Sequence, residues 1–188
     1  MFGRILRIMV VGSFCVAFLG SAWGAGEDKE IKSPRPDKQP KIDQKQLESF
    51  QKSNAEIADL YASVQGKIDE LSAALEQMGG ANAKDKRKLE KQERSLRGEI
   101  TRDRRKLDKL LEKQIAPAEQ AYLENKGKVD GYNDKAKKAE GAGDEKKAQK
   151  LYQEAAKYNG ATESAKRKLD LLYYHTFFTG DEILKDGE

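Results

Sequence analysis

The stretch that decides the fold is residues 47–78, LESFQKSNAEIADLYASVQGKIDELSAALEQM. Mostly apolar residues recur in it every three or four positions and would form one face of a helix, here called the seam. In order they are Leu47, Phe50, Asn54, Ile57, Tyr61, Val64, Ile68, Leu71, Leu75 and Met78. Alternating steps of four and three keep an apolar stripe facing a partner helix in a coiled coil. The spacing therefore predicts a helix over residues 43–78, capped by Asp43. We interpret Asn54, the one amide on the seam, as a polar residue that fixes helix register.

Two further segments carry related patterns, and glycine turns separate them. Gly79-Gly80 ends the first helix, and a second is expected over about residues 83–140. Its seam changes register after Leu111, and Pro117 follows, so this helix is expected to kink there or to restart with Pro117 in its first turn. Residues 141–143 (GAG) form the second turn, and a third helix is expected over residues 144–178.

The predicted fold class is all-α. Because both turns are short, neighbouring helices should run antiparallel, giving an elongated helical hairpin or three-helix coiled-coil rod over residues 43–178. Charge agrees, since residues 43–78 carry a net charge of −4 and residues 84–114 one of +6. Folding at the turns should bring together Phe50, Leu110, Leu111, Leu172, Tyr173 and Phe177. Residues 179–188 are expected to form an acidic tail.

The N-terminal residues have the features of an export signal. Arg4 and Arg7 precede an apolar run over residues 8–19, and small residues follow at the cleavage positions. Residues 1–24 are therefore interpreted as a cleaved signal peptide, with an uncleaved N-terminal anchor as the alternative. Residues 25–42 contain three prolines among charged residues, which is typical of a disordered or extended linker. The expected location is periplasmic or extracellular.

Composition restricts the chemistry that the chain can carry. The only cysteine, Cys15, lies inside the signal segment, so the cleaved protein would have no thiol for a disulfide, a metal site or a nucleophile. His175 is the only histidine, and a single imidazole does not make an ordinary zinc site. No phosphate-binding glycine loop or nucleophilic serine context occurs either. We therefore expect no catalytic, cofactor-binding or metal-binding residues and no enzyme activity.

Two surfaces are candidate binding sites. In the aromatic run over residues 171–178, helical spacing directs half of the side chains inward, and Tyr174 and Phe178 are expected to face a partner. The basic cluster of Arg102, Arg104, Arg105 and Lys106 could bind an acidic protein, a phosphate or lipid headgroups, and the three arginines are the residues expected to bind a protein partner. The alternative for this cluster is a solvated helix face that the acids of the first helix neutralise.

These features favour an exported, non-enzymatic coiled-coil structural or adaptor protein of the cell envelope that binds a protein partner. The alternative is a periplasmic holdase-type chaperone that grips unfolded clients. Removing Arg4 and Arg7 with the signal leaves 34 of the 36 basic residues against 32 acidic ones, and this near balance argues against nucleic acid as a partner. Membrane contact is expected only if the N-terminal segment stays uncleaved, and the sequence is compatible with a homo-oligomer.

Overall fold

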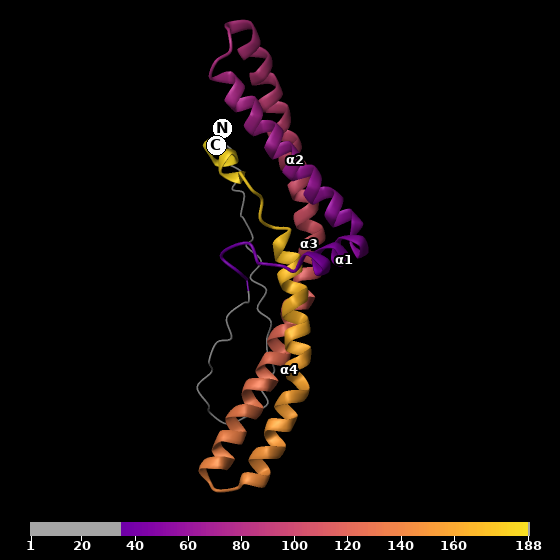
Figure 1. Cartoon of the computed structure of the whole chain (residues 1–188), viewed down its shortest axis with the longest axis vertical. Coiled ribbons are helices and arrows are strands. Elements are labelled where there is room, and N and C mark those ends of the chain that lie inside the picture. The colour runs from indigo at the N-terminus through magenta and orange to yellow at the C-terminus, as the bar shows by residue number, and fades with distance from the viewer. Residues whose placement is uncertain (1–34, 188) are drawn as a thin grey trace, which may run out of the picture. The chain divides into compact units, whose positions relative to one another are not determined.

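The computed structural model describes residues 35–187, which belong to one compact unit and form an all-α fold without strands (Figure 1). The elements in order are α1 (Gln44–Ser53), α2 (Ala55–Met78), α3 (Ala83–Gly141), α4 (Glu145–Tyr174) and the 3-10 helix η1 (Asp181–Gly187). The predicted all-α class is thereby confirmed for the described residues. The expected signal peptide, residues 1–24, and residues 25–34 of the expected linker lie outside them.

Three helices begin at a side-chain cap. The side-chain oxygens of Asp43, Asn82 and Asp144 accept hydrogen bonds of 3.0–3.2 Å from backbone N–H groups in the first turns of α1, α3 and α4. Such bonds pair N–H groups that have no partner within the helix. Gly143 makes the turn before α4 with a φ of 77°, a conformation that residues with a Cβ rarely adopt.

The expected helix over residues 43–78 is interrupted at Asn54, which corrects the prediction of one continuous element. Asn54 lies between α1 and α2 with φ −132° and ψ 53°, outside the helical region. Its Nδ2 donates to the carbonyl of Phe50 at 3.0 Å, and its Oδ1 accepts from Gln114 Nε2 on α3 at 3.3 Å. Short polar side chains compete with the helical backbone for hydrogen bonds in this way, so the polar residue on the seam ends one helix and ties the break to α3.

Of the two alternatives for the second helix, the restart at Pro117 is not found, and the third helix is shorter than expected. α3 continues through Pro117, so the helix does not restart there. α4 ends at Tyr174, four residues before the expected boundary at residue 178. Side chains hold its last carbonyls, because Thr176 Oγ1 donates to Tyr173 O at 2.8 Å and His175 Nδ1 lies 2.8 Å from Leu171 O. Residues after Tyr174 therefore leave the helical path.

The helices pack in pairs, α2 against the first part of α3 and α4 against the second (Figure 1). Partners run in opposite directions, because Ile57 shares a cluster with Leu107 whereas Ile68 shares one with Leu96. The junction cluster lies where the helix pairs meet, and its buried members are Ile57, Leu107, Leu111, Ala118, Leu169, Leu172 and Tyr173. The hairpin cluster lies between α2 and α3 and buries Val64, Ile68, Leu71, Leu96 and Ile100.

The expected convergence of distant residues is found in the junction cluster. Phe50 and Leu110 pack against its buried members, which include Leu111, Leu172 and Tyr173. The place expected for Phe177 is taken by Phe178. Because α4 has ended by then, the helical period that assigned Phe177 to the inner face no longer applies.

Residues 177–184, here called the C-terminal strap, fold back over the α2–α3 pair instead of forming a free acidic tail. Thr179 exchanges two hydrogen bonds of 3.0 Å with the side chain of Gln65 on α2. Arg97 on α3 donates to the carbonyl of Ile183 at 3.0 Å. Phe178, Ile183 and Leu184 pack against the hairpin cluster. The strap therefore covers one face of the α2–α3 pair, and its apolar residues account for the difference from the predicted acidic tail.

The net charges of α2 and α3 predict pairs of α2 acids with α3 bases, but the observed ion pairs join a base of α2 to acids of α3. Lys67 on α2 lies 2.6 Å from Asp103 and 3.5 Å from Glu99 on α3. Its amino group lowers the pKa of the Asp103 carboxyl, and the carboxyl raises the pKa of Lys67. No acid of α2 pairs with a base of α3 within residues 35–187. The acidic surplus of α2 and the basic surplus of α3 therefore stay unneutralised by each other.

Candidate functional site

An open groove of about 820 Å³ lies between α2 and α3, and we call it the hairpin groove. Its lining residues are Glu56, Asp59, Leu60 and Ser63 from α2 and Lys106, Lys109, Leu110 and Lys113 from α3. Other residues, Tyr61, Gln65, Arg97 and Arg104, make the hydrogen bonds and the ion pair that hold the C-terminal strap. The groove thus lies on the face of the helix pair that the strap leaves uncovered.

Leu60 and Leu110 form the apolar part of the groove. Both are half-buried and pack against the junction cluster from its edge. Each belongs to the helical spacing that points toward the core but remains partly accessible. Partly exposed leucines between two charged walls provide apolar area that an incoming helix could cover.

The two walls of the groove carry opposite charge. Glu56 and Asp59 are exposed on α2, while Lys106, Lys109 and Lys113 recur at helical spacing on α3. Lys106 pairs with Asp103 at 3.3 Å. The other four make no ion pair with any residue that the structure describes. A partner with complementary charge could bind both walls at once.

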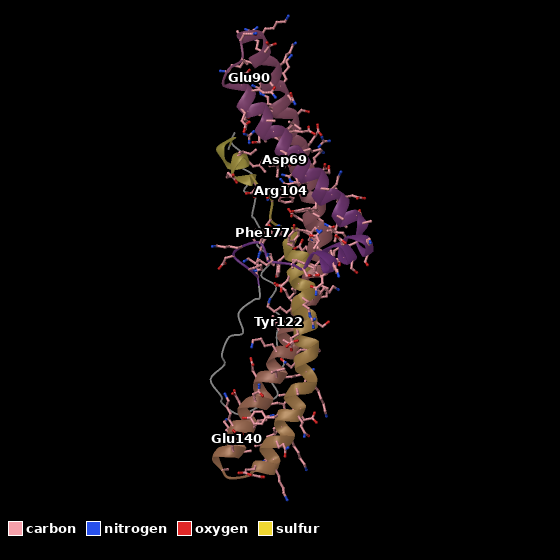
Figure 2. All side chains as sticks on the ribbon, viewed as in Figure 1. Asp69, Glu90, Arg104, Tyr122, Glu140 and Phe177 are labelled. Atoms are coloured by element: carbon pink, nitrogen blue, oxygen red, sulfur yellow. The ribbon has the colours of Figure 1, made fainter. Side chains whose placement is uncertain are left out.

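The predicted basic residues divide into two kinds. Arg102 and Arg105 are exposed, one helical turn before Lys106 and Lys109, so they extend the basic wall along α3. Arg104 points to the strap: its guanidinium lies 3.5 Å from Asp181 and 5.0 Å from the centre of the Phe178 ring. Figure 2 labels Arg104 and Phe177 at the level where the strap leaves α4 and meets α3. Arg104 therefore holds the strap, whereas its two neighbours stay accessible to a partner.

A second feature, here called the aromatic junction, surrounds His175. The imidazole is 0% exposed, and its ring centre lies 5.2 Å from Phe50, 5.0 Å from Tyr61 and 5.3 Å from Tyr174. Because the Leu171 carbonyl can only accept, Nδ1 carries the hydrogen and donates to it. Nε2 is buried without a hydrogen-bond partner among the described residues. Burial lowers the pKa of this imidazole, so it is held as the neutral form.

The two aromatic residues predicted to face outward are instead part of this junction. Phe178 is half-buried and stacks on Tyr61 at 5.0 Å, so its ring packs against α2 and does not point away from the helices. Tyr174 is half-buried, 6.0 Å from the Tyr61 ring, and its carbonyl accepts from Gln39 Nε2 at 3.3 Å. Both residues tie the end of α4 to α2 and to the segment before α1. Their role in binding a partner stays a prediction.

The hairpin groove is the site that the sequence did not indicate. The available signal was the recurrence of Lys106, Lys109 and Lys113 one turn after the predicted arginines. Which side of the α2–α3 pair stays open depends on the course of the strap, and helical periodicity carries no information about that. Within residues 35–187, no three His, Cys, Asp or Glu side chains lie together so that they could hold a metal ion.

Among the described residues, no helix combines the length and apolar character needed to cross a membrane. No protein-family model, curated protein or solved structure matches the chain. The hairpin groove is therefore the feature of the chain from which a function can be inferred.

Proposed function

We propose that the chain is an exported, non-enzymatic coiled-coil structural or adaptor protein of the cell envelope that binds a protein partner through the hairpin groove. The observation that carries the proposal is the groove itself, with two partly exposed leucines between an acidic wall and a basic wall. An amphipathic helix with flanking charges of both signs matches such a surface. The N-terminal sequence supports export, because its basic start and apolar run are typical of a signal peptide.

The distribution of apolar surface favours an adaptor function over a holdase-type chaperone function. A chaperone of that kind needs accessible apolar side chains for unfolded clients. Among the described residues, Tyr152 is the one large apolar residue that is exposed, with 36% of its surface accessible. A surface that presents ordered charges around a narrow apolar strip favours a folded partner of defined shape.

The proposal is tested by photo-crosslinking in the full-length exported protein. A photo-reactive amino acid replaces Ser63 in the groove, and a matched control carries it at Ser164, which is exposed on α4. We expect one discrete protein adduct from position 63 and none from position 164. The adduct should be lost with Lys109→Glu plus Lys113→Glu and kept with Lys147→Glu plus Lys150→Glu, exposed lysines of α4. The same adducts from both positions would overturn the proposal.

A further inference from the structure

The arrangement of charge across the hairpin groove is self-complementary. At one level of the α2–α3 pair, the acids Glu56 and Asp59 belong to one helix and the bases Lys106, Lys109 and Lys113 to the other. A two-fold rotation about an axis parallel to the helices, between two copies facing each other, places α2 of each copy over α3 of the other. Every acidic wall then meets a basic wall, twice in one interface, as an isologous contact requires.

The apolar part of the groove obeys the same symmetry. Leu60 lies on α2 and Leu110 on α3, both lining the groove between the charged walls. The rotation places Leu60 of each copy near Leu110 of the other, so the four leucines meet at the centre and the charges form a rim. A central apolar contact inside a polar rim is the usual anatomy of a protein interface.

The ion pairs within one copy leave these charges available. The pairs between α2 and α3 use Lys67 from α2 with Glu99 and Asp103 from α3, which removes a base from the acidic helix and acids from the basic one. The remaining surplus is acidic on α2 and basic on α3, and no described residue neutralises it across the pair. The surface that best matches this surplus is the same pair of helices in the opposite order.

We propose that a second copy of this chain occupies the hairpin groove, so that two α2–α3 pairs form an antiparallel four-helix contact about a two-fold axis. This inference rests on the proposed function, because it names the occupant of the same groove. The strap and its contacts lie on the opposite face and do not obstruct the second copy. Each protomer would present its strap face outward.

The test is a charge swap in the full-length exported protein, read by light scattering over a dilution series. The acidic-wall variant carries Glu56→Lys and Asp59→Lys, and the basic-wall variant carries Lys109→Glu and Lys113→Glu. None of these four residues has an ion-pair partner within the described chain, so each variant should keep the helical circular dichroism of the parent. Lys147→Glu plus Lys150→Glu on α4 is the matched control.

We expect the parent and the control to show twice the mass of one chain and to dissociate with the same constant. Each wall variant alone should be monomeric, with dimer dissociation raised at least tenfold, because like charges then face each other. An equimolar mixture of the two wall variants should form a dimer again, since both of its contacts are acid against base. Rescue by mixing requires that the acidic wall of one copy meets the basic wall of the other, and a mass of two chains limits the assembly to a dimer.

A monomeric parent at every concentration would overturn the inference, as would a dimer whose mass neither wall variant changes. A monomer that still forms a groove-dependent adduct at position 63 with a different protein overturns the dimer and leaves the proposed function standing. Equal adducts from positions 63 and 164 would overturn the proposed function and, with it, the dimer through this groove.

Discussion

The rings of Phe50 and His175 lie with their centres 5.2 Å apart, although they come from α1 and from the residue that ends α4. The contact requires the chain to fold back at both turns, so that its first and last helices meet beside α3. Tyr61 from α2 closes the same cluster with its ring edge-on to the imidazole. The strap leaves from this junction, and the uncovered hairpin groove lies on the other face of the α2–α3 pair.

The buried imidazole makes stability depend on pH. Burial lowers the pKa of His175 below its ordinary 6.5, so the unfolded chain binds a proton more readily than the folded one as the pH falls below that value. We expect the free energy of unfolding to be constant above pH 6.5 and to fall below it, by at most about 1.4 kcal/mol per pH unit. Urea titrations at several pH values between neutrality and the carboxylate range measure this slope.

The matched variant for the pH dependence is His175→Phe. It keeps an aromatic ring in the junction and removes the only imidazole of the chain. Its stability should be flat over the range in which the parent loses stability. An equal slope in parent and variant would show that another group causes it.

The C-terminal strap is expected to stabilise the α2–α3 pair. Phe178 packs against both clusters, and Phe178→Ala would expose part of Tyr61 and of the hairpin cluster. Losing this apolar burial should lower the free energy of unfolding by about 2 kcal/mol. Amide exchange should rise in α2 near Ile68, whose side chain lies beside Gly180 of the strap. Tyr152→Ala, at an exposed position of α4, should leave both measurements close to the parent.

The two hydrogen bonds of Asn54 at the break between α1 and α2 are expected to stabilise the fold. Asn54→Ala removes the bond to the Phe50 carbonyl and leaves Gln114 without its acceptor. Because both groups are half-buried, the free energy of unfolding should fall by about 1 kcal/mol. Asn159→Ala, which removes one exposed bond to Glu163 on α4, is the control. Thermal or urea unfolding that ranks the two variants equally would contradict a tertiary role for Asn54.

The Lys67–Asp103 pair is expected to affect how the free energy of unfolding changes at acidic pH. Hydrogen bonding to Lys67 lowers the pKa of Asp103 below 3.8, so its contribution is present above that pH and is lost as the pH falls through the lowered value. Asp103→Asn should therefore lose less stability than the parent on acidification, by up to about 1 kcal/mol at low salt. Asp108→Asn, exposed and without an ion pair among the described residues, should behave like the parent. A salt-insensitive difference would contradict an ionic origin.

Periodicity predicted the helices and their meeting point because both follow from local spacing. The seam through Ile57 and Ile68 and the steps to Leu107 and Leu111 determine which faces are apolar, and the glycine turns determine which residues lie opposite each other. The same logic does not extend beyond Tyr174. Once Thr176 and His175 side chains hold the last carbonyls of α4, a 3.6-residue period assigns Phe178 to the wrong side.

The burial of His175 and the position of the groove depend on contacts between distant segments. His175 is enclosed by Phe50 and Tyr61, which local sequence around residue 175 cannot indicate. The strap had a local signal that the net charge of the C-terminal residues concealed, namely the adjacent Ile183 and Leu184. Because the strap covers one face of the α2–α3 pair, Leu60 and Leu110 remain partly exposed on the other face.

The most direct test of the doubled-back arrangement is the nuclear Overhauser spectrum of the single imidazole. His175 should show cross-peaks to the ring hydrogens of both Phe50 and Tyr61, whose ring centres lie 5.2 and 5.0 Å from its own. It should also titrate below 6.5, in keeping with its buried position. An imidazole that titrates at its ordinary value and shows no contact with either ring would contradict the meeting of the first and last helices at α3.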